Sequence, residues 1–313
     1  MATVLVTGGA GFIGSHLTRA LLARGDEVRV LDDLSTGSEV NLEGTQARVI
    51  VGDIRDPDVV QAAVRGAELV FHEAARISVA ESMGAPLSFY ETNLIGSLNV
   101  LWAAQEAGVR RVVMASSAAV YGEVDGQVKE TDPTNPVSPY AASKVAMEKA
   151  GRLFAEAYGL STVSLRYFNV YGPRQSPDSP YAAVIPIFIR EMLAGAPVTI
   201  HGDGRQSRDF VFVEDVVRAN LLAAEMAEAD GSVFNVAGGQ SISIQDLAQA
   251  LRRVIPGAPQ PVSGPTRPGD IRFSAAGLHR AEQALGYRPA TVLERGLQQT
   301  VEWFRAGRPI AAA

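Results

Sequence analysis

Val4-Leu5-Val6-Thr7-Gly8-Gly9-Ala10-Gly11-Phe12-Ile13-Gly14 is the stretch of this sequence that decides the fold. A short run of branched apolar residues leads into a glycine-rich turn, and an amphipathic segment from Ser15 to Arg24 follows. A second apolar run, Glu27 to Leu31, ends at Asp32-Asp33. This order predicts a strand, a tight turn, a helix and a second strand ending in an acid, which is typical of half a dinucleotide-binding unit.

Three glycines of the turn have a physical purpose. Gly8 permits the tight turn, Gly11 removes a side chain that would block a pyrophosphate, and Gly14 lets the helix pack closely. The free N–H groups and the positive dipole end of the helix favour bound phosphates. Asp32 lies about 20 residues past the glycines, where a carboxylate can accept a hydrogen bond from a ribose hydroxyl.

Composition narrows the classes of protein. A chain of 313 residues with 47% hydrophobic and 20% charged residues suits a full globular core. The net charge of −6 argues against nucleic acid or an anionic membrane as partner. The chain has no cysteine, and its four histidines show no ligand spacing, so we expect no metal site. The N-terminus enters a strand directly, so we expect no signal peptide, no membrane span and a cytoplasmic location.

Strands alternate with helices in the first half of the chain. We therefore predict an α/β fold with a doubly wound parallel sheet of the Rossmann type. We expect two domains with a boundary near residue 170: an NAD-binding domain at 1–170 and a smaller α/β substrate domain at 171–313. Some later segments are expected to pack back onto the first domain. The predicted helices include 86–107, 142–158, 183–193, 244–254 and 290–304, and the predicted strands include 111–115, 162–166, 198–200, 210–213 and 233–236.

Tyr140 and Lys144 stand four residues apart in Tyr-Ala-Ala-Ser-Lys, so both lie on one face if a helix begins near Tyr140. A tyrosine at its ordinary pKa of about 10 is a poor base at neutral pH. We expect the Lys144 ammonium and a positive nicotinamide ring to lower the pKa of Tyr140. Ser117 ends the adjacent strand, where its hydroxyl can reach the same substrate oxygen.

These motifs together resemble the extended short-chain dehydrogenase/reductase family, and within it the nucleotide-sugar 4-epimerases. The resemblance runs from residue 2 to about 305. It is carried by the glycine turn, Ser117 and the Tyr140–Lys144 pair, and by Arg166 to Arg174, Ser207-Arg208-Asp209-Phe210 and Arg267-Pro268-Gly269-Asp270. It implies redox-neutral inversion at C4 of UDP-hexoses through a 4-keto intermediate, with NAD as cofactor.

The resemblance also implies roles for single residues. Tyr140, Lys144 and Ser117 would be catalytic. The residues that would bind NAD are Gly8, Gly11, Phe12, Ile13, Gly14, Asp32, Asp33, Ser35, Thr36, Gly37, Asp53, Ile54, Ala74, Ala75, Asn93, Ala115, Tyr140, Lys144 and Tyr167. Those that would bind the UDP-sugar are Ser117, Asn169, Ala183, Val184, Thr199, His201, Arg208, Arg267, Asp270 and Ser274.

Several positions bear on the type of reaction. Ala119 stands where many 4-epimerases carry Thr, and Ile77 stands where some carry Lys. The 4,6-dehydratases of the family place an Asp-Glu pair, and the decarboxylases a Glu, just after the strand-end residue. Ala118 and Ala119 occupy those positions here and cannot move a proton. A UDP-glucuronate epimerase, another dehydratase or decarboxylase, and a non-catalytic NAD(P)-sensing protein stay as alternatives.

Three finer expectations follow. Asp32 and Asp33 would repel a 2′-phosphate, and no arginine follows in 34–37, so we expect NAD rather than NADP. In the 4-epimerases that this chain resembles, the position of Ser274 borders the C2 substituent of the sugar, and a tyrosine there excludes an N-acetyl group. The resemblance and the small side chain of Ser274 therefore imply UDP-GlcNAc and UDP-GalNAc as substrates beside UDP-glucose and UDP-galactose. The helices near 86–107 and 142–158 could pair with a second copy, which predicts a homodimer.

Overall fold

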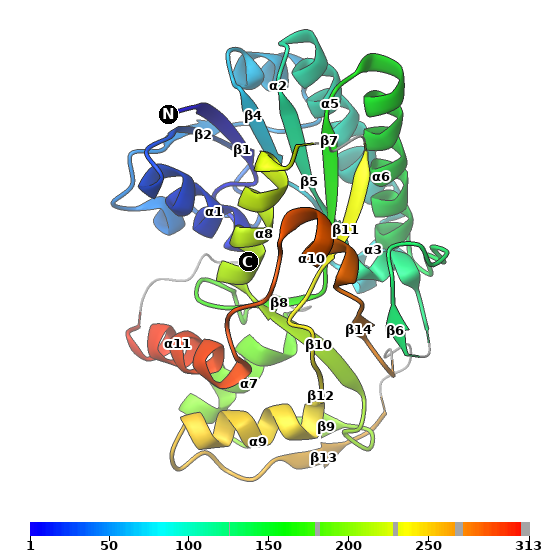
Figure 1. Ribbon diagram of the computed structural model, residues 1–313. Coiled ribbons are helices and arrows are strands. Elements are labelled where there is room, and N and C mark those ends of the chain that lie inside the picture. Colours follow the sequence, from blue (N-terminus) through cyan, green and yellow to red (C-terminus); the bar gives the residue numbers. More distant parts are fainter. Residues whose placement is uncertain (125, 179–181, 228–230, 267–271, 308–313) are drawn as a thin grey trace.

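The computed structural model describes residues 1–124, 126–178, 182–227, 231–266 and 272–307 (Figure 1). A seven-stranded parallel sheet dominates the upper part of the view. In spatial order its strands are β11 (Ser232–Val236), β7 (Thr162–Tyr167), β5 (Arg111–Ser117), β4 (Leu69–His72), β1 (Thr3–Thr7), β2 (Glu27–Asp32) and β3 (Arg48–Val51). The predicted doubly wound sheet is thus confirmed.

The strands of this sheet are apolar on both faces because helices cover both. Val4 and Val6 pack on one side, and Leu5 between them packs on the other. The helices of the first side are α1 (Phe12–Ala23), α8 (Val213–Glu225) and α10 (His279–Leu285), and those of the second are α2 (Pro57–Val64), α5 (Ser97–Glu106) and α6 (Pro139–Tyr158). Figure 1 shows α5 and α6 side by side along the sheet.

The single helix expected over 86–107 is divided. It consists of α4 (Pro86–Tyr90), a π-helical turn η2 (Glu91–Gly96) and α5. The Ser97 hydroxyl donates to the carbonyl oxygen of Asn93 at 2.6 Å, and the buried His72 ring contacts the same hydroxyl at 2.8 Å. A single π turn in a helix is frequent at functional sites. The short helix α3 (Val79–Gly84) and the 3₁₀ turn η1 (Glu39–Leu42) were not expected.

Helix α6 begins earlier than the sequence analysis placed it. Pro139 occupies the first helical position, and the Ser138 hydroxyl accepts from the backbone N–H of Ala141 at 3.1 Å. Tyr140 therefore lies in the first turn of the helix.

The smaller lobe has its own core. Its three-stranded sheet has the order β12 (Ser241–Ser243), β10 (Ser207–Phe212), β8 (Asn169–Tyr171), and β9 (Thr199–His201) pairs with β13 (Val262–Gly264). Helices α7 (Val184–Leu193), α9 (Ile244–Val254) and α11 (Leu293–Arg305) surround an apolar cluster that includes Phe188, Phe212 and Leu251 (Figure 1).

The chain passes between the lobes more than once. After β10 it returns as α8 and β11, which pairs with β7 at the edge of the large sheet. The short strands β6 (Gln127–Val128) and β14 (Ala275–Ala276) also pair across a long separation in sequence. The division at residue 170 stays a prediction. Among the described helices, none has the length and apolar character to cross a membrane.

Candidate active site

The glycine turn lies at the point where the strand order reverses. Strand β1 has β2 on one side and β4 on the other, so the loops after β1 and β4 leave the sheet side by side. Gly8 has φ +69°, and a Cβ there would lie 2.6 Å from the backbone nitrogen of Ala74. Only glycine fits this close approach. Ligands of open α/β sheets bind in the crevice at such a switch point.

The start of α1 offers unpaired donors for phosphate. A Cβ on Gly14 would lie 2.1 Å from the carbonyl oxygen of Gly8, so the first turn of α1 lies directly on the glycine turn. Gly11 caps the helix without a side-chain hydrogen bond. The N–H groups of Phe12, Ile13 and Gly14 have no acceptor within the helix by virtue of their position. This cradle fits the diphosphate of a dinucleotide.

Asp32 ends β2 beside this cradle. Its carboxylate accepts from the backbone N–H groups of Ala10 and Leu34, each at 2.9 Å. Burial is the main cause that raises the pKa of Asp32. A carboxylate has about four acceptor positions, so capacity for a ribose hydroxyl remains. The predicted residues Asp33, Ser35, Thr36 and Gly37 form the adjoining loop, where Ser35 Oγ donates to Asp33 Oδ1 at 2.6 Å.

Asp53 has a partner that the sequence analysis missed. Arg55 Nε donates to Asp53 Oδ2 at 2.8 Å, and this hydrogen bond lowers the pKa of Asp53. Arg55 is also close enough to Asp33 for its positive charge to be stabilised by that carboxylate. Ile54 between them is buried. The loop next to Asp32 thus holds an arginine that is already paired with a carboxylate.

The three predicted catalytic residues meet at the carboxyl edge of the sheet. Ser117 is the last residue of β5, and Tyr140 and Lys144 lie one turn apart on α6. The Ser117 side chain lies close enough to the Tyr140 hydroxyl to oppose the rise in the pKa of Tyr140. The Lys144 ammonium donates to the carbonyl oxygen of Ala115 at 2.7 Å. The tyrosine oxygen and the serine hydroxyl can therefore contact one substrate oxygen.

Burial controls the electrostatics of this group. It raises the pKa of Tyr140, and the nearby Ser117 hydroxyl opposes the shift. It lowers the pKa of Lys144 to about 8, while Glu73 and Glu148 oppose that shift. The pKa of Tyr140 is therefore raised and not lowered as expected from Lys144, because desolvation by burial is the largest cause of its shift. The positive nicotinamide ring, the second group expected to lower the pKa of Tyr140, is not among the causes of this shift.

Asn93 holds the catalytic helix to a neighbouring loop. Its side chain accepts from the backbone N–H of Arg76 at 2.8 Å and donates to the Arg76 carbonyl at 2.9 Å. It also donates to the Ser143 hydroxyl at 3.0 Å, and Ser143 donates to the carbonyl oxygen of Tyr140 at 2.7 Å. The predicted cofactor residue Asn93 thus lies one hydrogen bond from α6.

Tyr167 forms a second buried network. It ends β7 opposite Ser117 in the strand register. Its hydroxyl donates to Glu73 Oε1 at 2.7 Å and accepts from Asn220 Nδ2 at 2.7 Å. Burial raises the pKa of Glu73 to about 7. Ala74 and Ala75 follow Glu73 along the loop, as expected for a strand end that admits a ligand.

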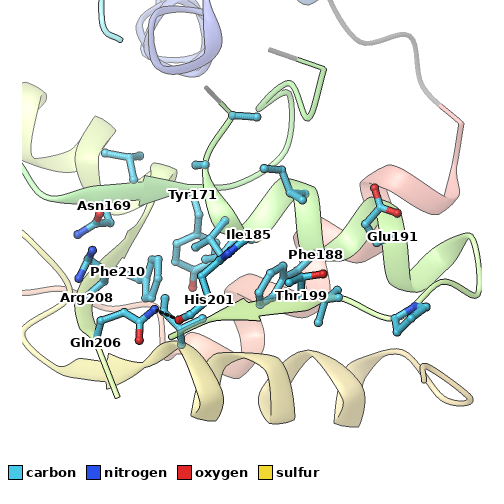
Figure 2. Close-up of a pocket in the computed structure, with 18 residues that line it drawn as sticks. Asn169, Tyr171, Ile185, Phe188, Glu191, Thr199, His201, Gln206, Arg208 and Phe210 are labelled. Atoms are coloured by element: carbon cyan, nitrogen blue, oxygen red, sulfur yellow. Dashed lines mark hydrogen bonds between the residues drawn. The ribbon is translucent and has the colours of Figure 1, made fainter. Parts of the chain in front are cut away.

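A cavity of about 710 Å³ lies in the smaller lobe, within the size range of small-ligand sites (Figure 2). Helix α7 and strands β8, β9 and β10 form its walls. Six of the predicted substrate residues line it: Asn169, Ala183, Val184, Thr199, His201 and Arg208. Figure 2 shows Asn169 and Arg208 at one end and Glu191 at the other. The cavity thus has a positive guanidinium at one end and a carboxylate at the opposite end.

Four predicted substrate residues do not line this cavity. Ser117 belongs to the catalytic group, and the half-buried Ser274 precedes β14, where its carbonyl oxygen accepts from the Ser241 hydroxyl. Arg267 and Asp270 fall outside the described residues. The roles predicted for all ten substrate-binding residues stay proposals.

Other residues of the site were missed. Phe188, Glu191, Gln206 and Phe210 line the cavity, and Glu73 joins the Tyr167 network. Phe188 packs in the core of the smaller lobe and also lines the cavity. The helical period of α7 therefore predicts only that Phe188 is buried. Glu73 had one sequence signal, an acid between an apolar strand and two alanines.

Comparison with known proteins places this geometry in a family. Residues 4–237 match the model of the NAD dependent epimerase/dehydratase family. The chain is 41% identical over 308 residues to a UDP-glucose 4-epimerase of Mycolicibacterium smegmatis, with 96% of this chain and 98% of that one covered. It is similar in structure to a UDP-N-acetylglucosamine 4-epimerase from Methanobrevibacter ruminantium in complex with UDP-N-acetylmuramic acid (TM-score 0.94, 39% identity, 98% and 99% covered). A Thermus thermophilus UDP-glucose 4-epimerase in complex with NAD gives a TM-score of 0.89 at 41% identity, with 97% and 99% covered.

Proposed function

Because this chain belongs to the NAD-dependent epimerase/dehydratase family, we propose that it interconverts UDP-hexoses that differ in configuration at C4. One observation carries the proposal. Ser117, Tyr140 and Lys144 come together at the edge of the sheet that also holds the dinucleotide turn. The relatives with the same fold over nearly their whole length include 4-epimerases of UDP-sugars.

The residues divide the chemistry among them. NAD, when bound, supplies a reversible acceptor for the C4 hydride. Tyr140 takes the proton of the C4 hydroxyl and returns it to the product, so it ends each turnover unchanged. Ser117 donates a hydrogen bond to the same oxygen, and Lys144 would hold the nicotinamide ribose. The 4-keto sugar must present both faces of C4, which yields either epimer with no net oxidation.

The cavity in the smaller lobe supports a nucleotide sugar as substrate. We propose that Arg208 binds the diphosphate, since a guanidinium forms paired hydrogen bonds with phosphate oxygens. Arg267 and Asp270 are proposed to assist. Ser274 is proposed to leave room for an N-acetyl group, which extends the substrates to UDP-GlcNAc and UDP-GalNAc. The proposed two-domain division at residue 170 would place the sugar between the catalytic group and this cavity.

A dehydratase or decarboxylase is not favoured. Ala118 and Ala119 form the start of the 3₁₀ turn η3 (Ala118–Tyr121) directly after Ser117. Their methyl groups can neither donate nor accept a proton. A UDP-glucuronate epimerase would use the same three catalytic residues, so it stays an alternative substrate of the same reaction.

We further propose a homodimer formed through the outer faces of α4, α5 and α6. Leu87, Trp102, Leu153 and Tyr158 on these helices, and Ile95 on η2 between α4 and α5, are exposed apolar residues. The rings of Trp102 and Tyr158 lie 6.0 Å apart, so they form one continuous patch across α5 and α6. The expected cytoplasmic location stays a prediction.

One experiment tests the reaction and the substrate together. The purified protein is incubated with UDP-glucose, UDP-GlcNAc and UDP-glucuronate in turn, and the products are identified by NMR. We expect the C4 epimers of the first two. A stable 4-keto-6-deoxy sugar as main product, or conversion of UDP-glucuronate alone, would contradict the proposed function.

A further inference from the structure

A buried carboxyl group that the proposed reaction does not use lies beside the catalytic residues. Glu73 directly follows β4, and its backbone N–H donates to the carbonyl oxygen of Thr7 at 3.1 Å. Its Oε1 accepts from the Tyr167 hydroxyl at 2.7 Å. Asn220 Nδ2 donates to the same hydroxyl oxygen at 2.7 Å. Because Asn220 supplies a donor there, the hydroxyl proton of Tyr167 is directed at Glu73.

The pair of side chains crosses the site. Strands β4 and β7 are separated by β5, so the hydrogen bond from Glu73 to Tyr167 spans the carboxyl end of β5. Tyr167 stands opposite Ser117 in the register of β5 and β7. A dinucleotide whose diphosphate lies at the β1–α1 turn extends over these strand ends. Glu73 is thus placed for the nicotinamide half rather than the adenine half.

The charge of Glu73 is under-compensated. Lys144 is the cation that favours its ionised form, but burial outweighs this effect and raises the pKa of Glu73 to about 7. A second positive charge nearby would stabilise the carboxylate. The nicotinamide ring of NAD carries such a charge, whereas that of NADH is neutral.

We propose that Glu73 makes this site select the oxidised cofactor, its carboxylate at the Tyr167 hydroxyl countering the positive charge of the NAD ring. The inference rests on the proposed placement of the nicotinamide half beside Tyr167. In an epimerase, hydride taken from C4 must return to the sugar in every turnover. A site that stabilises NAD over NADH favours that return and keeps reduced enzyme from accumulating.

The test measures bound cofactor rather than turnover. Wild-type protein and variants are equilibrated with an equimolar mixture of NAD and NADH, freed of unbound dinucleotide, and extracted for quantification. Glu73→Gln keeps the size and an acceptor for Tyr167 but removes the charge. We expect the ratio of bound NAD to NADH to fall roughly ten-fold, the scale of one nearby charge in a partly buried site.

Two control variants separate charge from other effects. Glu68→Gln removes the same charge from an exposed position before β4, and Glu73→Asp keeps the charge on a shorter side chain. Glu68→Gln should keep the wild-type ratio, and Glu73→Asp should keep a preference for NAD. An unchanged ratio in Glu73→Gln, or an equal shift in Glu68→Gln, overturns the proposal. If wild-type protein shows the ratio but epimerises no UDP-sugar, the proposed substrate is wrong and this inference stands.

Discussion

At the scale of single residues, burial and hydrogen bonding decide what Tyr140 can do. Its ring packs edge-on against Phe89 at 6.4 Å, while its hydroxyl meets Ser117. Tyr140→Phe keeps the ring and its packing and removes the group that moves the proton. We expect turnover to fall roughly 10²- to 10⁴-fold, measured as epimer formation by NMR. Bound NAD and the thermal midpoint serve as controls and should not change, and a variant above about a tenth of the wild-type rate would exclude Tyr140 as the base.

Ser274 carries the prediction about substrate size. Ser274→Tyr should abolish turnover of UDP-GlcNAc by steric clash and spare UDP-glucose, since only the former carries a bulky C2 group. Parallel initial rates on the two substrates check this. Ser274→Ala is the matched control, because it removes the hydroxyl without adding volume and should keep both activities. Equal slowing of both substrates by Ser274→Tyr would show that the residue supports the turn before β14 instead.

At the scale of elements, the β1–α1–β2 unit decides which dinucleotide binds. Asp32 already accepts two backbone N–H groups and lies next to Asp33, so a 2′-phosphate would meet two carboxylates. The nearby Arg55 is paired with Asp53 and offers little compensation. We expect the dissociation constant for NADP to exceed that for NAD by roughly ten-fold or more, measured by calorimetry. Asp32→Asn should reduce the difference between the two dissociation constants. Comparable constants for NADP and NAD in the wild-type protein would contradict the predicted preference for NAD.

Helix α1 is tied to the other lobe by a histidine, which predicts a pH dependence of stability. His16 Nε2 lies 2.8 Å from the carbonyl oxygen of Pro173 in the loop after β8. Burial, with help from Arg174, lowers the pKa of His16 to about 4. Below about pH 6.5 the His16 ring is therefore protonated in the unfolded chain but stays neutral in the folded chain until the pH approaches 4. The free energy of unfolding falls as the pH drops through this range.

Urea unfolding at two pH values measures this effect. His16 should contribute a loss of about 2 kcal/mol in the free energy of unfolding between pH 7 and pH 5. His16→Gln keeps a donor for the Pro173 carbonyl and cannot be protonated, so its loss over this range should be smaller by that amount. The same pH dependence in both proteins would show that the His16 ring is not held neutral.

At the scale of the whole molecule, the apolar patch on α5 and α6 predicts the assembly. Trp102 is 49% exposed, and so is Tyr158 beside it. Trp102→Glu should convert a dimer into a monomer in analytical ultracentrifugation, because a buried unpaired carboxylate is costly in an interface. Val292→Glu is the control, since Val292 is 65% exposed on the smaller lobe and should not change the mass. A wild-type monomer at micromolar concentration would contradict the proposed dimer.

The sequence by itself determined the parallel sheet, the glycine turn and the spacing of Tyr140 and Lys144. These features are local: an apolar run, a turn that only glycine allows, and one helical turn between two side chains. Only the tertiary structure decided which groups surround them. Glu73 meets Tyr167 across 94 positions in sequence, and the direction of the Tyr140 pKa depends on how deeply the ring is buried. The cavity walls come from α7, β8, β9 and β10. The apolar periodicity of these elements predicts which residues are buried but does not separate core residues from cavity-lining ones, so the sequence alone could not show that they enclose a site.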